Sequence, residues 1–328
     1  MEFQLPISIS PLPRPIAYGD SILLTGSCFT EHIGDALRDW KFRTLQNPHG
    51  ILFDAASVAS SLTSYIRPQL YTGDDLVYLN ELWQSWQHHG VFSGVDKEQV
   101  LAGINASQER AHAFLRGADW LVITLGSAFS YRLAAAAGNP AVANCHRAPG
   151  KTFVKHMMSI EEIVTSLDSC LHQLFYFNSK LRVIFTVSPV RHSRDGVVEN
   201  NRSKARLIES VHHLVNKFDR LFYFPAYELV IDVLRDYRFF DIDMVHPNYA
   251  ATQYVLEKFT DFGIEAGARP LLEEVRKLVT ARGHRPMHPS TAAHERFMRE
   301  QYEKAVELAR VHPFLDLREE IDYFGKGK

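Results

Sequence analysis

The stretch Ile22-Leu23-Leu24-Thr25-Gly26-Ser27-Cys28-Phe29-Thr30 decides the fold. Its three consecutive apolar residues are typical of a strand buried on both faces, and the run stops at Gly26. Two small residues with nucleophilic side chains, Ser27 and Cys28, follow, and a helical pattern begins after them. A strand that turns sharply into a helix presents such side chains at the carboxyl edge of a parallel sheet. The stretch therefore predicts an α/β fold with a nucleophile at that edge.

A second stretch, Asp243-Met244-Val245-His246-Pro247-Asn248, has the side chains that would activate a nucleophile. An imidazole such as His246 takes a proton from a thiol or hydroxyl, and a carboxylate such as Asp243 holds the ring in one tautomer. Pro247 is expected to begin the helix that follows. Asp241 is the alternative orienting acid, and a surface ion pair is the alternative role for either carboxylate.

Outside these two stretches, strand-like apolar runs alternate with helical periodicity. Strands are predicted at 21–25, 42–45, 120–125, 183–187 and 221–224, and helices at 29–40, 55–66, 160–175, 204–218 and after residue 246. The runs at 120–125 and 183–187 are apolar throughout, as in strands that helices cover on both faces. This order predicts a three-layer α/β/α sandwich with a mostly parallel sheet and ligands at its carboxyl edge.

Two segments do not follow this alternation. Residues 68–118, rich in Trp, His and Gly, are predicted to form an insertion over the sheet edge. After residue 264 the pattern is helical and charged, with a break at 282–286. We therefore expect an α/β domain at 1–263, which starts with a proline-rich extended lead-in. A helical C-terminal extension at 264–328 is expected to pack on it or to mediate homo-oligomerisation.

Composition narrows the classes of partner. The chain has 328 residues, 46% hydrophobic and 23% charged, with a net charge of −2, which is ordinary for a globular protein. Such a charge gives no reason to expect nucleic acid or an anionic membrane as a partner. No secretory leader or run of about 18 apolar residues is present, and the three cysteines suit a reducing compartment, so a cytoplasmic location is expected. The basic stretch 202–206 is interpreted as the solvated face of a helix.

The two quoted stretches resemble those of the GSCFA-domain family, named after a Gly-Ser-Cys-Phe-Ala block whose last position is Thr30 here. Through that family the chain is similar to the SGNH (GDSL-like) hydrolases, which have a Gly-Asp-Ser-x-Thr block and an Asp-x-x-His block. The resemblance runs from about Asp20 to about Phe259 and includes 47–50, 83–89, 144–146 and 188–192. It implies the same three-layer fold and an acyl-transfer activity.

The resemblance also implies which residue attacks. Aligning the block that begins at Gly26 with Gly-Asp-Ser-x-Thr places Cys28 at the nucleophile position. The positive end of a helix favours a thiolate, and an adjacent imidazolium would lower the pKa of the thiol further. A register shift of one residue would make Ser27 the nucleophile. An inert buried thiol at Cys28 is the third alternative.

Acyl transfer also needs hydrogen-bond donors for the oxyanion. The backbone N–H of Cys28 is the first candidate. Gly50 lies where the similar hydrolases have a second backbone donor, and Asn47 is expected to brace that loop. Their third donor is the Asn of a Gly-x-Asn block; here Gly126 begins the corresponding segment and Ala128 replaces the Asn. The alternatives for the missing amide are Ser127, Asn144 and a histidine of segment 68–118.

Further polar and aromatic residues are predicted to line a substrate pocket: Trp86, His88, His89, Asn144, His146 and Arg191. Arg191 follows a predicted strand and would suit a substrate carboxylate or phosphate. Cys145 with nearby histidines offers zinc-ligating atoms, but the short ligand spacing typical of a zinc site is missing, so no metal is assigned. No Gly-x-Gly-x-x-Gly or Walker loop is present, so no organic cofactor is expected.

The sequence thus favours an esterase, thioesterase or acyltransferase acting on an ester of a small molecule or carbohydrate. Cys28 or Ser27 would attack the acyl carbonyl and His246, oriented by Asp243, would take its proton. A non-catalytic binding protein of the same fold is the first alternative. The second is a metal-dependent hydrolase that uses Cys145, His146, His88 and His89.

Overall fold

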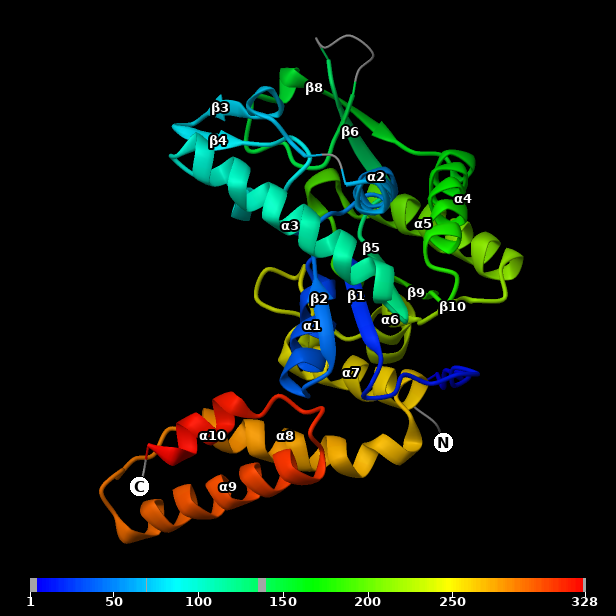
Figure 1. Cartoon of the computed structure of the whole chain (residues 1–328). Helices are drawn as coiled ribbons and strands as arrows, with labels where there is room; N and C mark the ends of the chain where they lie inside the picture. Colours follow the sequence, from blue (N-terminus) through cyan, green and yellow to red (C-terminus); the bar gives the residue numbers. More distant parts are fainter. Residues whose placement is uncertain (1–4, 69, 135–139, 327–328) are drawn as a thin grey trace.

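The computed structural model describes residues 5–68, 70–134 and 140–326. Its centre is a five-stranded parallel sheet with strand order β10-β9-β5-β1-β2 (Figure 1). The strands are β1 (Ser21–Gly26), β2 (Arg43–Gln46), β5 (Trp120–Leu125), β9 (Arg182–Val187) and β10 (Leu221–Tyr223). The order reverses between β1 and β5, and α/β proteins bind ligands at the carboxyl ends of strands at such a switch point.

Side chains along each central strand alternate between two buried faces. In β1, Leu23 belongs to one apolar cluster, whereas Ile22 and Leu24 belong to the other. The first cluster is covered by α2 (Ala55–Ile66), α3 (Lys97–Gly117), α4 (Ile160–Phe177) and α5 (Val197–Lys217). The second is covered by α1 (Phe29–Asp39), α6 (Ala226–Glu228), η5 (Leu229–Leu234) and α7 (Tyr249–Gly263). The predicted three-layer α/β/α sandwich is therefore confirmed.

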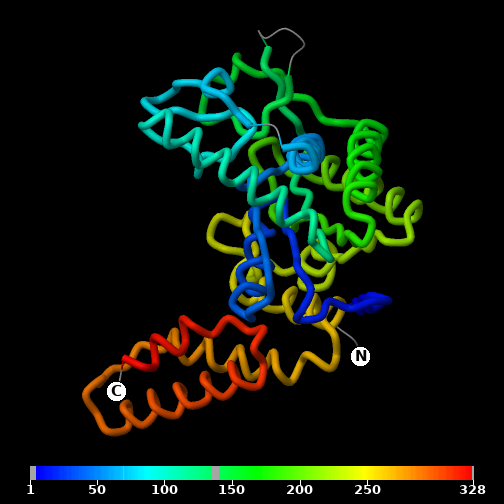
Figure 2. Tube along the Cα trace, in the orientation of Figure 1, coloured from blue at the N-terminus to red at the C-terminus, as the bar shows by residue number. Residues whose placement is uncertain are grey.

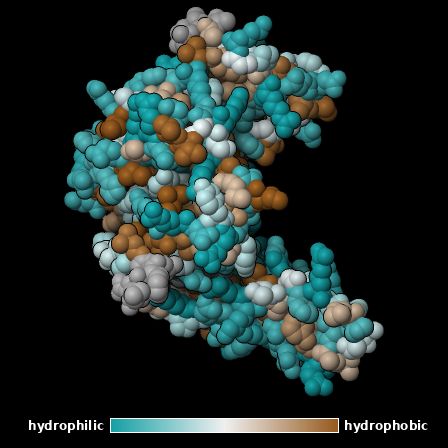
Figure 3. All heavy atoms as spheres, turned by 180° about the vertical axis from the view of Figure 1, so that it is seen from behind, coloured by the Kyte–Doolittle hydropathy of each residue, from teal (hydrophilic) through white to brown (hydrophobic). Residues whose placement is uncertain are grey.

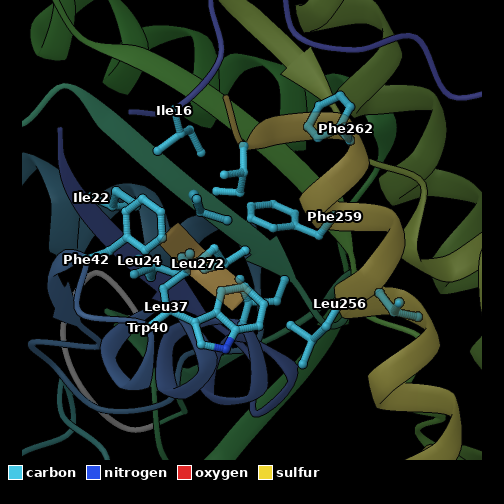
Figure 4. Close-up of a cluster of buried hydrophobic side chains, with 14 of the residues drawn as sticks. Ile16, Ile22, Leu24, Leu37, Trp40, Phe42, Leu256, Phe259, Phe262 and Leu272 are labelled. Carbon is cyan, nitrogen blue, oxygen red and sulfur yellow. The ribbon is translucent and has the colours of Figure 1, made fainter. Parts of the chain in front are cut away.

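The second cluster extends into the C-terminal helices α8 (Arg269–Gly283), α9 (Ala292–Val311) and α10 (Arg318–Gly325). Figure 4 shows Ile22 of β1, Leu37 of α1 and Leu272 of α8 converging in it. Each buried aliphatic or aromatic side chain of this kind stabilises the fold by about 1.5–3 kcal/mol. A helical C-terminal region is thus present as predicted, and its apolar residues share a core with the α/β sheet.

A buried ion pair also joins the C-terminal helices to the sheet domain. The Glu320 side chain is 0% exposed, and its Oε2 lies 2.8 Å from the Nζ of Lys41, the second residue after α1. Arg282 at the end of α8 contacts the other carboxylate oxygen at 3.2 Å. In Figure 1 these helices lie at the opposite end of the molecule from the hairpin of β3 (Val77–Leu79) and β4 (Leu82–Gln84).

Segment 68–118 differs from the predicted insertion because its second half is the long helix α3. Asp96 caps α3 by accepting from the N–H groups of Glu98 and Gln99. Only the first half forms a small unit, with η1 (Gly73–Asp75), the antiparallel hairpin β3 (Val77–Leu79) and β4 (Leu82–Gln84), and η2 (Gly90–Phe92). Few α3 positions are strongly apolar, and its buried stripe includes Ser107 and Gln108, so its helical period is weak in the sequence.

A second sheet was not predicted from the sequence. It is antiparallel, in the order β7-β6-β8, and comprises β6 (Phe129–Leu133), β7 (Ala141–Val142) and β8 (Phe153–Met157), with η3 (Gly150–Thr152) before β8. Most residues of β6 and β8 are partly or fully exposed, so these strands lack the continuous apolar run of buried strands. The remaining short helices are η4 (Ser193–Asp195), η6 (Tyr237–Phe239) and η7 (Ala266–Ala268).

Two predicted helix boundaries were wrong. Helix α5 begins at Val197, seven residues before the predicted start, after Gly196 with a φ of 85°. Helix α7 begins at Tyr249, because Asn248 is its N-cap and accepts from the Ala251 N–H. Pro247 therefore lies outside the helix. Its backbone pairs instead with Phe240.

The proline-rich lead-in runs extended beside α7, where the N–H groups of Leu12 and Ile16 donate to the carbonyls of Phe262 and Gly263 (Figure 2). Residues 1–4 of that predicted segment lie outside the described residues. Seen from behind, the C-terminal helices form a mostly hydrophilic lobe, and the surface is hollowed between lobe and body (Figure 3). No helix in the described part of the chain is both long and apolar enough to cross a bilayer.

The buried ion pair between Lys41 and Glu320 leads to a prediction about the stability of the fold. Glu320→Gln should lower the free energy of unfolding by about 3 kcal/mol, because it removes the buried anion of Lys41 and leaves only the exposed Glu319 at 4.0 Å. Glu319→Gln is the control, since that side chain is 71% exposed and its ion pairs should contribute less than about 1 kcal/mol. Urea denaturation measures both variants. Equal effects would show that the buried pair does not fasten the C-terminal helices.

Candidate active site

The end of β1 is shaped by Gly26. Its φ is 138°, and an added Cβ would lie 2.1 Å from the carbonyl oxygen of Thr124 on β5. The Gly26 N–H donates to Asn47 Oδ1 at 3.1 Å, and the Asn47 N–H donates to the Leu24 carbonyl at 2.8 Å. Asn47 therefore binds the end of β1 through two hydrogen bonds. Only glycine fits at the turn into α1.

The two candidate nucleophiles differ in access. Ser27 is 1% exposed, its N–H donates to the Thr124 carbonyl, and its hydroxyl has no hydrogen-bond partner among the described residues. Cys28 is the N-cap residue of α1 and is only partly buried. The N–H groups of Cys28 and Phe29 donate to no oxygen within the described ranges. Cys28 is thus the more accessible of the two, at the open end of a helix.

The surroundings of Cys28 act on its thiol in opposite directions. Burial is the largest influence and raises its pKa, and the Glu31 carboxylate adds to this. The ammonium of Lys204 and the N–H groups of Phe29 and Cys28 lower the pKa. The net shift is upward. The lowering expected from the helix N-terminus is therefore outweighed by burial.

Asp243 and His246 form a pair at the surface. The Asp243 Oδ2 lies 2.7 Å from the His246 Nδ1, and Oδ1 accepts from the N–H groups of Val245 and His246 at 2.9 and 3.1 Å. These bonds hold the pKa of Asp243 at about 2, so it is a carboxylate at neutral pH. The arrangement leaves the His246 Nε2 free for proton transfer, and 45% of the side chain is exposed.

The loop that carries this pair lies beside the first turns of α1. Burial lowers the pKa of His32, which lies one helical turn after Cys28 on α1, and His246 lowers it further. Cys28 and Val245 pack against the same apolar cluster. No hydrogen bond joins Cys28 to His246 among the described residues. The structure thus brings the two predicted segments to one side of α1 without direct contact between these two side chains.

Arg191 holds the His246 loop in place. Its guanidinium carbon lies 3.9 Å from the Phe240 ring centroid, and Nη1 donates to the Met244 carbonyl at 3.1 Å. The Arg191 N–H donates to the Val245 carbonyl as well. The guanidinium predicted to meet a substrate anion is therefore engaged within the protein. A role for Arg191 in binding a substrate anion stays a prediction, since these contacts use Nη1 and one face of the guanidinium.

The predicted oxyanion donors are also engaged in part. The Gly50 N–H donates to the Asn47 carbonyl at 2.7 Å, and the Gly126 N–H donates to the Phe53 carbonyl at 2.8 Å. Both backbone donors are used to shape their turns. In contrast, the Asn47 Nδ2 is buried and has no hydrogen-bond partner in the described part of the chain. Its side-chain amide is one of the unpaired donors of this region, with the Ser27 hydroxyl, and it faces the Glu31 carboxylate.

Several predicted pocket residues gather in a buried imidazole cluster. The rings of His49 and His88 stack with centroids 4.1 Å apart, and Tyr65 OH lies 2.7 Å from the His49 Nδ1. Burial lowers the pKa of His88 to about 2, so this ring is neutral. His89 closes the cluster at the loop between β2 and α2, because its N–H donates to the His49 carbonyl and its Cβ occupies the space beside Gly50.

The segment 144–146 packs against residues 85–86 through the side chains of Trp86, Asn144 and His146. The His146 Nε2 lies 2.7 Å from the Ser85 carbonyl, and its N–H donates to the Asn144 Oδ1 at 2.9 Å. The Trp86 ring packs on that of His146 at 5.8 Å. Cys145 is partly exposed beside them. Across the described ranges no three His, Cys, Asp or Glu side chains gather as they would around a metal ion.

Sequence analysis missed Lys204, which was interpreted as part of a solvated helix face. The side chain is 1% exposed, and its Nζ lies beneath the candidate site. The signal that could have revealed it is the apolar stripe of α5 at Leu207, Val211 and Leu214. Continued towards the N-terminus at the same helical spacing, that stripe reaches Ser203 and Lys204. Both face the core.

His192 is the second residue that sequence analysis left without a role. Burial and the Lys204 ammonium lower its pKa to about 4, so its imidazole is neutral near pH 7. Its ring packs edge-on against Phe53 at 5.7 Å. His192 therefore lies beside Gly126, because the Phe53 carbonyl accepts a hydrogen bond from the Gly126 N–H. The site edge thus includes an uncharged imidazole from the loop after β9.

These features define a three-layer α/β protein with a thiol at the switch point of its parallel sheet. The chain belongs to the GSCFA family, whose model matches residues 21–259. A second match, to the GSCFA domain protein C-terminal domain, covers residues 275–327. Comparison with curated proteins finds no match.

Two of the solved structures that match the chain are carbohydrate-active esterases by name. A carbohydrate esterase family 3 protein from Talaromyces cellulolyticus is 9% identical with a TM-score of 0.37, and the match covers 79% of this chain and 99% of that chain. The acetyl xylan esterase Est2A from the rumen bacterium Butyrivibrio proteoclasticus is 11% identical with a TM-score of 0.37. That match covers 79% of this chain and 65% of the esterase.

The geometry at Gly26 predicts the effect of a single methyl group. Gly26→Ala should lower the free energy of unfolding by about 3 kcal/mol or more, because it adds a backbone clash to an unfavourable φ. Gly103→Ala on α3 is the control: a Cβ there meets open space, so the change should be neutral or stabilise the helix by up to about 1 kcal/mol. Thermal and urea denaturation compare the two. A mild effect at Gly26 would contradict the tight contact between β1 and β5.

The contacts of Arg191 predict local dynamics. Arg191→Met should increase amide hydrogen exchange in residues 241–246 about fivefold, since it removes the bond to the Met244 carbonyl and the contact with the Phe240 ring. Arg194→Met, at an exposed position in the same loop, is the matched control. Unchanged exchange in the Arg191 variant would mean that the guanidinium does not hold the loop.

Proposed function

We propose that this GSCFA protein is an acyl-transfer enzyme, an esterase, thioesterase or acyltransferase, with Cys28 as its nucleophile. The observation that carries the proposal is the placement of Cys28. The thiol lies at a strand-to-helix turn, at the switch point of the sheet, with the Asp243–His246 pair on the loop beside the same helix. Such a turn next to a carboxylate-oriented imidazole suits nucleophilic catalysis.

Acylation follows from these groups. Cys28 Sγ attacks the acyl carbonyl carbon, and the thiol proton passes to the His246 Nε2, whose partner nitrogen Nδ1 is held by Asp243. A motion of the exposed His246 side chain closes the distance once substrate binds. The tetrahedral intermediate then collapses, the bond to the leaving group breaks, and His246 returns the proton to the leaving oxygen or sulfur. The acyl group remains on Cys28 as a thioester.

Deacylation uses the same base. His246 takes a proton from water or from an acceptor hydroxyl, whose oxygen attacks the thioester carbonyl. The bond to Sγ breaks and the thiol of Cys28 is restored. In both steps the Cys28 N–H and the Asn47 Nδ2 are the donors that this proposal assigns to the oxyanion. The Cys28 N–H donates to no oxygen among the described residues, and the Asn47 Nδ2 would turn from the Glu31 carboxylate to the oxyanion.

The substrate class is an ester of a small molecule or carbohydrate. The proposal rests on the aromatic and imidazole side chains that the segment 83–89 places over the loop at Asn47 and Gly50. Aromatic rings with neutral polar edges suit sugar rings and other uncharged ligands. Trp83, Trp86 and His89 are the partly exposed rings among them.

A non-catalytic binding protein is the second candidate. Two observations favour it: burial raises the pKa of the Cys28 thiol, and Ala128 replaces the oxyanion asparagine of the similar hydrolases. A protein of this kind would bind an ester or sugar without turnover. It differs from the enzyme in a measurable way, because its thiol would react with acyl probes no faster than a free cysteine.

Labelling by an aryl thioester or p-nitrophenyl ester probe tests the enzyme. Cys28→Ala should abolish covalent labelling and turnover, and His246→Ala should lower both by about 100-fold or more, because each removes one partner of the proton transfer. Cys145→Ala, another partly exposed thiol, is the control and should keep full labelling. Labelling lost in Ser27→Ala but kept in folded Cys28→Ala would assign the attack to Ser27. Equal labelling of all variants at a free-cysteine rate would support the binding protein.

A further inference from the structure

The edge strand β10 borders a cavity at the side of the parallel sheet opposite β2. This strand is only three residues long, and no other strand in the described part of the chain pairs with its outer edge. The lead-in at residues 7–13 lies across from that edge and is attached to α7, where the Leu12 N–H donates to the Phe262 carbonyl. Between the lead-in, β10 and α5 is an open cavity of about 520 Å³. This volume lies within the range of about 300–1,000 Å³ that is typical of small-molecule sites.

The walls of the cavity are mostly apolar. Ile7 and Ile9 of the lead-in and Phe222 of β10 pack against the cluster that includes Phe262. Val215 of α5 packs against the cluster on the other face of the sheet. The cavity therefore lies where the two apolar layers meet, and these wall residues other than Phe262 are only partly buried. An apolar molecule in this space would remove their surface from water, which favours binding by about 25 cal/mol per Å².

A carboxylate also lines the cavity. Glu228 of α6 is half-buried, and its two side-chain oxygens lie 2.8 and 2.9 Å from the Tyr223 hydroxyl, which donates to them. That hydroxyl has one hydrogen, whereas a carboxylate offers about four acceptor positions. Among the described residues Glu228 forms no ion pair, and no Lys or Arg lines the cavity. The carboxylate therefore has unused acceptor positions next to an apolar surface.

The groups that face Glu228 act on its charge in opposite directions. Burial is the largest influence and raises its pKa, and Asp232 on the following helical turn adds to this. The N–H of Glu228 itself, the Tyr223 hydroxyl and His212 lower the pKa, but the net shift is upward. His212 of α5 is an exposed residue of the cavity wall, with its ring 4.6 Å from that of Tyr223. A cation bound beside Glu228 would offset the effect of burial on the carboxylate.

We propose that this cavity binds an apolar primary amine, with the hydrocarbon part between the lead-in and β10 and the ammonium on the Glu228 carboxylate. The occupant follows from complementarity, since the walls are apolar and the carboxylate has no ion-pair partner among the described residues. Glu228 and Asp232 would repel an anionic ligand. A neutral ligand would give the carboxylate no cation. The site is separate from Cys28, because β9 and β5 lie between β10 and β1.

Isothermal titration calorimetry of the full chain with three matched ligands tests the class of occupant. 4-Phenylbutylamine, 4-phenylbutanol and 4-phenylbutanoate share one apolar body and differ in the charge of the end group. Near neutral pH the amine should bind about tenfold more tightly than the alcohol, because its ammonium makes a charge-assisted hydrogen bond, and the carboxylate should bind most weakly. Equal affinities of all three, or no binding of the amine up to about 10 mM, would overturn the proposal.

Two variants test whether Glu228 holds the ammonium. Glu228→Gln keeps the length of the side chain and removes its charge, so the amine and the alcohol should then bind within about twofold of each other. Asp232→Asn is the matched control, since this exposed carboxylate lies one helical turn later and does not line the cavity. That variant should keep the preference for the amine. A preference that persists in Glu228→Gln, or that both variants lose, would show that the ammonium does not bind at Glu228.

NMR of the protein with its native sequence locates the ligand even if Glu228→Gln does not fold. In methyl-labelled protein 4-phenylbutylamine should shift the resonances of Ile7, Ile9 and Val215 and leave that of Ile242 unchanged. Ile242 is 99% exposed and reports non-specific binding to apolar surface. Shifts at Ile242 without shifts in the lead-in would place the amine elsewhere and reject the site. None of these measurements uses Cys28, so their outcome is independent of the proposed function.

Discussion

The contact between Gly26 and the Thr124 carbonyl is the constraint on which the site depends. Because no side chain fits there, β1 and β5 approach closely and β1 can turn at once into α1. The turn sets Cys28 at the helix N-terminus and brings it into electrostatic reach of Lys204, which spans the ends of β5 and β9. Asn47 secures the same turn from the other side. The positions of Cys28 and the groups around it therefore depend on how the strands pack more than on the conformation of any single loop.

At Cys28 two general effects compete, and their sizes decide the outcome. A helix N-terminus stabilises an anion by about 0.3–1 kcal/mol, whereas burial can shift a pKa by several units. The raised pKa of Cys28 follows from that difference. A thiol in such a place needs a discrete charge close by if it is to ionise. Backbone dipoles alone do not supply enough stabilisation.

The sequence predicted those parts of the fold whose signals are local and strong. Strand β5 and helix α2 were predicted at their observed bounds because their apolar patterns are unbroken. The sheet β7-β6-β8 was missed because its strands are short and half exposed, and α3 because polar residues occupy much of its buried stripe. The pairing of Asp243 with His246 could be read from their spacing. The burial of Lys204 could be predicted only by continuing the apolar stripe of α5, because a charged residue in a basic stretch ordinarily faces water. The backbone bonds of Gly50 and Gly126 could not be predicted, since they depend on how distant loops meet.

The core shared between the sheet and the C-terminal helices has a consequence for shortened forms of the chain. Leu272, Val275 and Leu278 of α8 are at most 1% exposed, and Arg276 covers the ring of Trp40. Proteolysis after α7 would uncover the apolar faces that these side chains protect, on α1 and around it. Exposed patches of that kind drive self-association. The two family segments therefore share one core, and a form without the C-terminal helices would leave that core open at α1.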